Sequence, residues 1–267
     1  MARPIITFTS DFGHADWFTG VVQGVIHGIA PDARVIEVTH EVRPGDIERA
    51  AFILEAAAPD FPADTIHLAV VDPGVGTDRR GLAVRAHGQW FVGPDNGLLE
   101  WAFHDPAYEA RSLTERRWFR EPVSRSFHGR DVFAPVAAHL AAGTALDAFG
   151  PRIGDPVRIA PPPPRDDDGV LRGRVMFIDR FGNALTNLRE PTVRAAFPGV
   201  ADDRLEVKVA GRSLRGLVRT YGDAPRGTLI ALMGSSGRLE VAVVEGDVAW
   251  RFGVGVGDPV SVRIAAG

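Results

Sequence analysis

The stretch VVDPGVGTDRRG, residues 70–81, decides how the first part of this chain folds. An apolar run ends in Asp72, a Pro-Gly turn follows, and GLAVRAHGQWFVG at 81–93 then predicts a β-hairpin. The glycines allow a ligand to approach the backbone, the arginines suit an anion, and the aspartate suits acid–base work or a metal. The loop does not match a phosphate loop, which needs Gly-Lys-Ser/Thr opening a helix. A hairpin turn with a solvated arginine pair is the plainer interpretation.

Strand-like and helix-like segments alternate on either side of this loop. Strands are expected at 4–9, 33–40 and 65–72, and helices at 17–30, 45–61 and 130–143. Such alternation predicts an α/β fold with a mostly parallel central sheet. We therefore expect an N-terminal α/β domain over residues 1–159.

The amino-acid composition changes at APPPPRDDDG, residues 160–169, where a run of prolines is followed by an acidic cluster. This composition predicts a stiff, solvated linker. Short strands separated by turn residues dominate after it, for example RLEVKVAG, TLIALMG and DPVSVRI. That pattern predicts a smaller C-terminal all-β domain over residues 170–267, either a barrel or a sandwich.

The amino-acid composition excludes several classes of function. The 267 residues carry a net charge of -4, so the chain lacks the overall positive charge that would attract nucleic acid. There are no cysteines, which excludes disulfides, thiolate metal sites and a cysteine nucleophile. No apolar run is long enough to span a bilayer, and MARPIITFTSDFG lacks the apolar region of a signal peptide. We expect a cytoplasmic protein with no membrane partner.

Two aspartates follow strands of the first domain. Asp11 comes after the first strand and Asp72 after the strand at 65–72. Ligands of open α/β sheets bind at the carboxyl ends of strands, so both side chains face one crevice if their strands are neighbours. Asp11 is well suited to grip a ribose diol, and its plainer role is a helix cap.

The segment SFHGRDVF carries Ser126, His128, Arg130 and Asp131. A Ser/His/Asp nucleophile set is possible, although no Gly-x-Ser-x-Gly elbow accompanies it. The composition of GPDNGLLEW, residues 93–101, favours a turn with a structural role before a short helix. The eight histidines are scattered without HxH or HExxH spacing, so we expect no metal site.

Two turns of the second domain, DRFGNALTNL at 179–188 and MGSSGRLEVAV at 233–243, combine amide, hydroxyl and aromatic groups. Each is explained by a β-turn alone. Such groups also suit a purine and an amino-acid tail.

Six segments in this order resemble one family: TSDFG, VDPGVGT-x-RR, GPDNGLL, FHGRDVFAP, DRFGNALTNL and SSGRLEVAV are similar to motifs of the S-adenosyl-L-methionine (SAM) hydroxide adenosyltransferases, relatives of the fluorinase and chlorinase. The resemblance implies an α/β domain followed by a β-barrel domain. It implies that water attacks C5′ of SAM, releasing L-methionine and adenosine, with no cofactor. It also implies homotrimers with sites between the N-domain of one subunit and the C-domain of the next.

The resemblance assigns residues as well. Asp72, Arg79 and His128 match the family's Asp–Arg–His set, whereas the halogenase branch has a Tyr where Asp72 stands and Tyr–Ser where His128–Gly129 stand. The binding residues match as follows: Asp11 with the ribose carboxylate, Asp179 and Ser235 with the methionine part, and Phe181 and Asn183 with the adenine contacts. Two positions depart from the pattern: Gly45 replaces a substrate-packing tryptophan, and Val244 replaces an asparagine.

Two alternatives remain at the sequence level. A SAM-dependent halogenase would use chloride at the same carbon, and the carboxylate of Asp72 argues against an anion there. A non-catalytic adenosine or SAM binder would keep the binding residues without turnover.

Overall fold

The computed structural model describes residues 3–159, 166 and 168–266, and the chain divides into two compact units at Ile159. Each unit has its own sheet and its own core. Most of the linker expected at 160–169 lies outside the described residues.

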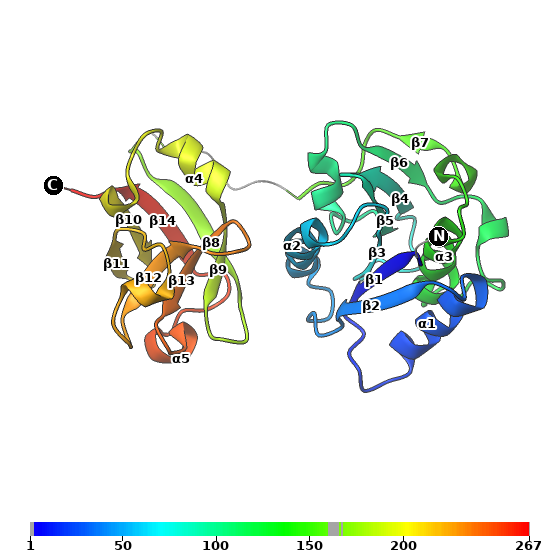
Figure 1. Ribbon diagram of the computed structural model, residues 1–267, viewed down its shortest axis with the longest axis horizontal. Coiled ribbons are helices and arrows are strands. Elements are labelled where there is room, and N and C mark those ends of the chain that lie inside the picture. The colour runs from blue at the N-terminus through cyan, green and yellow to red at the C-terminus, as the bar shows by residue number, and fades with distance from the viewer. Residues whose placement is uncertain (1–2, 160–165, 167, 267) are drawn as a thin grey trace. The chain divides into compact units, whose positions relative to one another are not determined.

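The N-terminal unit is built on a seven-stranded sheet in the order β2-β1-β3-β5-β4-β6-β7 (Figure 1). Its strands are β1 (Ile5–Ser10), β2 (Arg34–Thr39), β3 (Ile66–Val70), β4 (Gly81–Ala86), β5 (Gln89–Pro94), β6 (Glu109–Ser112) and β7 (Arg152–Ile153). Pairing is parallel from β2 through β1 and β3 to β5 and antiparallel from β5 onward. The α/β class is confirmed, with a mixed sheet whose parallel half carries the predicted strands.

Helices cover both faces of this sheet. They are α1 (Phe18–Ile29), α2 (Ile47–Ala57), α3 (Ala134–Ala141), the 3-10 turns η1 (Ala58–Asp60), η2 (Glu100–His104), η3 (Arg116–Trp118) and η5 (Leu146–Phe149), and the π-helical turn η4 (Gly129–Phe133). Figure 1 shows α2 on one side of the sheet and α1 and α3 on the other. The helix expected at 130–143 is therefore a π turn that continues into α3.

The alternation of side chains along β3 explains why every residue of this strand except His67 is apolar. Leu68 and Val70 pack in the core under α1 and α3, whereas Ala69 and Val71 pack in the core under α2. Successive side chains of a strand point to opposite faces, so a strand covered on both faces favours apolar residues on both. The buried His67 is accommodated because its Nδ1 lies 2.8 Å from the hydroxyl of Thr7. The two cores fix β1 and β3 side by side at the centre of the unit.

The C-terminal unit is a seven-stranded antiparallel sheet in the order β11-β10-β14-β8-β9-β13-β12. Its strands are β8 (Leu171–Ile178), β9 (Ala184–Arg189), β10 (Leu205–Val209), β11 (Arg212–Arg215), β12 (Leu229–Met233), β13 (Arg238–Val243) and β14 (Pro259–Ile264). Just after β11, the N–H of Val218 donates to the carbonyl of Ala231 at 2.9 Å, and Val218 bridges Leu232 in β12. These contacts bring the two ends of the sheet together, and the barrel-like architecture is confirmed.

Short helices interrupt this barrel: α4 (Glu190–Ala196), α5 (Val248–Phe252), and the 3-10 turns η6 (Asp202–Arg204) and η7 (Tyr221–Asp223). The sequence pattern did not predict them. Asp247 caps α5 by accepting from the N–H of Trp250 at 2.7 Å. Across the described residues of both units, no helix combines the length and apolar character needed to cross a membrane.

Candidate active site

The first cavity lies at the carboxyl ends of β1 and β3. These strands are parallel neighbours with Ser10 opposite Val70, so the residues that follow them, Asp11 and Asp72, come to one place. From β1 the chain passes to β2 on one side, and from β2 it crosses to β3 on the other. Such a switch point leaves an open crevice at the strand ends. A cavity of about 360 Å³ occupies it and confirms that the two aspartates face one crevice.

Asp72, Arg79 and His128 form one hydrogen-bonded cluster beside this cavity. The guanidinium of Arg79 binds both carboxylate oxygens of Asp72, with Nε 2.8 Å from Oδ1. A nitrogen of the same guanidinium lies 2.8 Å from Nδ1 of His128. Asp72 and His128 line the cavity, whereas Arg79 lies behind them with its guanidinium over the Phe133 ring. The side chains of Arg79 and Asp72 are only 12% and 6% exposed, which strengthens their attraction.

The contact with Arg79 fixes the tautomer of His128. A guanidinium can only donate, so Nδ1 of His128 must accept and the ring proton sits on Nε2. Burial lowers the pKa of His128 below its ordinary value, and the charge of Arg79 lowers it further against the opposing influence of Asp72. The ring is therefore neutral at pH 7, and its Nε2–H is the group available to a ligand or a water.

Asp11 is held by the backbone at Gly45, whose N–H donates to Oδ2 at 2.8 Å. Gly45 has φ +76, a conformation that favours glycine. Burial raises the pKa of Asp11 above its ordinary value, and the charge of Asp72 acts in the same direction, while the bond from Gly45 opposes both. Gly45, at the position matched to the substrate-packing tryptophan of the fluorinase, therefore contributes a backbone donor to the site.

The loop that carries His128 is clamped by the buried carboxylate of Asp131. Its Oδ2 accepts from the N–H of Ser124 at 2.8 Å, and Arg120 and Arg130 bind the same carboxylate. Hydrogen bonds and the arginine charges hold the pKa of Asp131 below its ordinary value although burial raises it. Asp131 thus organises the loop and does not contact His128.

The nucleophile set that the sequence allowed at this loop does not form. The hydroxyl of Ser126 lies 3.4 Å from that of Ser124 rather than against His128. In the described ranges, no three His, Cys, Asp or Glu side chains are grouped as metal ligands. The GPDNG turn is structural, since the Asn96 amide donates to the carbonyl of Val71 at 2.9 Å and fastens the turn next to Asp72.

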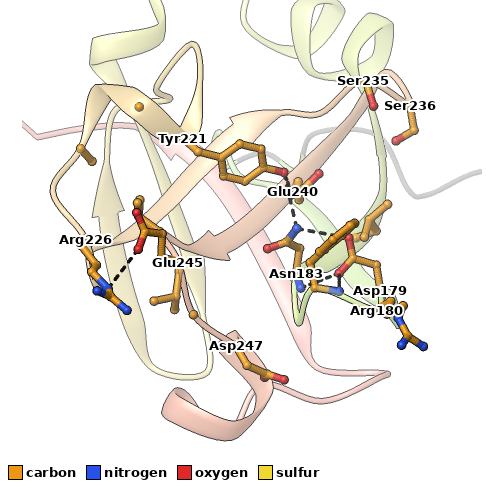
Figure 2. A pocket seen from close by; sticks show the side chains of 17 residues that line it. Asp179, Arg180, Asn183, Tyr221, Arg226, Ser235, Ser236, Glu240, Glu245 and Asp247 are labelled. Atoms are coloured by element: carbon orange, nitrogen blue, oxygen red, sulfur yellow. Dashed lines mark hydrogen bonds and ion pairs between the residues drawn. The ribbon is translucent and has the colours of Figure 1, made fainter.

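The second cavity, about 1080 Å³, lies in the C-terminal unit (Figure 2). It brings together the other predicted binding residues: Asp179, Phe181, Asn183 and Ser235. Asp179 organises the turn between β8 and β9, because its Oδ1 accepts from the N–H groups of Phe181 at 2.8 Å and Asn183 at 2.9 Å. Its Oδ2 accepts from the Asn183 amide at 3.2 Å. The Phe181 ring is 79% exposed, so it offers a free face for stacking.

Two further polar residues of this cavity, Tyr221 and Glu240, were not predicted from the sequence. The hydroxyl of Tyr221 donates to Oε1 of Glu240 and lies 3.5 Å from the Asn183 amide nitrogen. A signal for Glu240 was present, because it is the one acidic residue in the apolar strand sequence RLEVAV. Tyr221 gave none, since TYGDAP has the composition of an ordinary turn. Val244, where the family has asparagine, lines the cavity with an apolar side chain.

Comparisons with protein-family models match both units. The model described as SAM hydroxide adenosyltransferase N-terminal domain matches residues 6–150, and the model for the C-terminal domain of the same family matches residues 173–261.

Several curated proteins are similar over nearly the whole chain. A protein of Salinispora tropica named (R)-S-adenosyl-L-methionine hydrolase is 42% identical over 99% of this chain and 98% of its own length. A protein of Thermus thermophilus with the same name is 42% identical over 97% and 98%. A protein of an Actinoplanes species named fluorinase is 29% identical over 98% of both chains.

Solved structures agree with this fold. An uncharacterised conserved protein from Thermotoga maritima superimposes with a TM-score of 0.87 at 35% identity, covering 97% of this chain and 99% of the other. A conserved hypothetical protein from Thermus thermophilus gives a TM-score of 0.76 at 38% identity, covering 99% and 100%.

Proposed function

This chain belongs to the SAM hydroxide adenosyltransferase family, and from that premise we propose that it hydrolyses S-adenosyl-L-methionine to adenosine and L-methionine. In this reaction the oxygen of water forms a bond to C5′ while the bond from C5′ to sulfur breaks. Methionine leaves as a neutral thioether, and the proton lost by the water passes to the solvent. The names of the relatives at 42% identity support this reaction. The observation that carries the proposal is the Asp72–Arg79–His128 cluster at the edge of a cavity between two strand ends.

In this reaction the protein has to activate the nucleophile rather than the leaving group. A sulfonium leaves readily as a neutral thioether, whereas neutral water attacks poorly. In this proposal the Nε2–H of His128 holds the water oxygen, and the positive charge of Arg79 favours its developing hydroxide character. Asp72 keeps the guanidinium in place. Positioning and electrostatic stabilisation of this kind contribute roughly 10²–10⁴-fold or more to a rate.

The remaining predicted residues bind the substrate in this proposal. Asp11 accepts hydrogen bonds from the ribose hydroxyls at the first cavity. In the second cavity Phe181 stacks on the adenine and Asn183 meets its polar edge, while Asp179 and Ser235 bind the methionine part.

We further propose a homotrimer in which the N-terminal unit of one subunit and the C-terminal unit of the next complete each site. This is supported by the separation of the predicted residues into two cavities, one in each unit. Mixing and refolding Arg79→Ala with Asn183→Ala tests it. Activity recovered in the mixture supports shared sites, since only shared sites can combine two intact halves from different subunits. A mixture as inactive as its parents contradicts them.

One incubation tests the reaction itself. EDTA-treated protein is mixed with SAM in ¹⁸O-labelled water containing chloride, and the products are analysed by mass spectrometry. Adenosine with ¹⁸O at the 5′ position, together with methionine, is expected. A chlorinated nucleoside would instead identify a halogenase, and intact substrate would identify a binding protein. Loss of turnover after EDTA, restored by a metal ion, would contradict metal-independent hydrolysis.

A further inference from the structure

Glu240 is a buried acidic residue to which the proposed mechanism gives no role. It lies in the middle of β13, is only 6% exposed, and lines the cavity of the C-terminal unit. A carboxylate in this position has lost most of its hydration, which is unfavourable unless other groups replace the water. The neighbours of its two oxygens therefore decide what it can do.

Only one oxygen of Glu240 has a partner. Oε1 accepts from the hydroxyl of Tyr221, and Oε2 makes no hydrogen bond with any residue in the described parts of the chain. Oε2 lies against Gly234, where an added Cβ would come within 2.5 Å of it. The glycine that precedes the Ser235–Ser236 turn thus leaves room for this oxygen. Figure 2 shows Glu240 between that turn and the Asp179–Asn183 turn, with Tyr221 beside it.

The neighbouring carboxylate, Asp179, is differently occupied. Both of its oxygens already accept hydrogen bonds, from two backbone N–H groups and from the Asn183 amide. Asp179 therefore holds the 179–183 turn in shape, and it offers the methionine part its negative charge and the remaining lone pair of Oδ2. Oε2 of Glu240, in contrast, accepts no hydrogen bond from any residue that the structure describes.

We propose that Oε2 of Glu240 binds the α-ammonium group of the methionine part of the substrate. The proposal rests on the hydrolase function above and adds Glu240 to the residues that recognise the substrate. An ammonium is a compact cation with three N–H donors, and it suits an anchored carboxylate with one free oxygen. The hydroxyl groups of the nearby Ser235–Ser236 turn suit the α-carboxylate of the same amino acid.

The electrostatic surroundings of Glu240 agree with a cation as the partner of Oε2. Burial raises the pKa of Glu240 and the charge of Asp179 raises it further, against the opposing hydrogen bond from Tyr221. Two carboxylates that disfavour each other's charge gain most from a cation placed beside them. A neutral tail, or no tail, leaves this repulsion in place.

Binding measurements with two thioether ligands test the proposal. S-adenosylhomocysteine carries the amino-acid tail, methylthioadenosine lacks it, and neither has the sulfonium leaving group. Dissociation constants are measured by calorimetry for the wild type and for Glu240→Gln, which keeps the shape of the side chain. Glu240→Gln is expected to weaken S-adenosylhomocysteine about 10- to 100-fold, the range for a hydrogen bond to a charged group, and to change methylthioadenosine by less than about twofold.

Glu245→Gln is the matched control, because Glu245 lines the same cavity but is exposed and paired with Arg226 at 3.1 Å. It should leave both affinities unchanged. Equal weakening of both ligands by Glu240→Gln, or no weakening of S-adenosylhomocysteine, overturns the role of Glu240 and leaves the hydrolase function standing. Failure of wild-type protein to bind either ligand overturns the hydrolase function, and with it this inference.

Discussion

Gly76 packs directly against the carbonyl oxygen of Arg125, so closely that a Cβ at position 76 would lie 2.2 Å from that oxygen. Gly76 belongs to the loop between Asp72 and Arg79, and Arg125 belongs to the loop that carries His128. The two loops therefore meet backbone to backbone. Their separation sets the 2.8 Å contact between Arg79 and His128.

Gly76→Ala should separate these loops and cut turnover, by about 10²-fold if the displacement reaches 1 Å. It should also destabilise the fold by about 1–3 kcal/mol, because Gly76 has φ +79 as well as the close contact. Steady-state rates and thermal denaturation measure the two effects. Gly88→Ala is the control, since Gly88 has φ +74 with nothing within 4 Å of the added Cβ. Equal turnover losses in the two variants would show that loop separation is not the cause.

Arg79→Ala and His128→Ala should each lower kcat by about 10²–10⁴-fold with a smaller change in substrate affinity, because both side chains act on the water rather than on the nucleoside. Arg79→Lys should restore little, since an ammonium cannot span Asp72 and His128 as the planar fork does. Arg116→Ala is the control, because the side chain of Arg116 is 69% exposed and pairs with Glu121. Turnover at the wild-type level in Arg79→Ala or His128→Ala would refute the assigned roles.

The charge state of His128 predicts the acid limb of the pH profile. Its pKa is lowered by burial and by Arg79, so the neutral ring persists down to below pH 6.5 and activity should fall only in more acidic solution. Protonation at Nδ1 removes the acceptor for Arg79, which explains the loss. Titration of the ring by NMR should show a pKa below 6.5 in the wild type and a higher one in Arg79→Gln. An unchanged pKa in that variant would show that the guanidinium does not influence the ring.

Gly129 leaves little room for a side chain. A Cβ there would lie 3.1 Å from Cζ of Phe12 and 3.4 Å from a methyl group of Val70. Gly129→Ser, which introduces the residue expected in the halogenase branch, should therefore disturb Phe12 at the cavity wall and lower hydrolysis without producing a chlorinated nucleoside. Gly154→Ser is the control, since nothing lies within 4 Å of a Cβ there. Unaltered hydrolysis in Gly129→Ser would show that Phe12 moves aside freely.

Local patterns were sufficient to predict the first half of the fold. The strands at β1, β2 and β3 and the helices α1 and α2 follow from their apolar periodicity, and two aspartates at strand ends followed from their positions. These two aspartates face one crevice because β1 and β3 are neighbours in the sheet. The sequence alone does not show that the two strands pair. The assignments of Asp72, Arg79 and His128 came from the family resemblance, and the hydrogen bonds among them are visible only in the structure.

The misses have physical reasons. Strand β9 lies inside the segment DRFGNALTNL, where Thr186 and Asn187 hide its strand character. Thr186 is fully buried because its hydroxyl donates to the carbonyl of Leu239 at 2.8 Å, a partner 53 positions away. The pair of Tyr221 and Glu240 depends in the same way on a contact between distant turns and strands. The residues next to a position in the sequence do not indicate which distant residue it will contact.

The two apolar cores lie against the faces of the N-terminal sheet, whereas the groups proposed to act on the substrate project from loops beyond its strand ends. Substitutions in these loops can therefore change the groups around the substrate while both apolar cores keep their residues. Proteins named as hydrolases and as fluorinases share this architecture across nearly full-length alignments. In proteins built on this sheet, the choice of nucleophile is therefore expected to depend on residues of this rim rather than on the two cores.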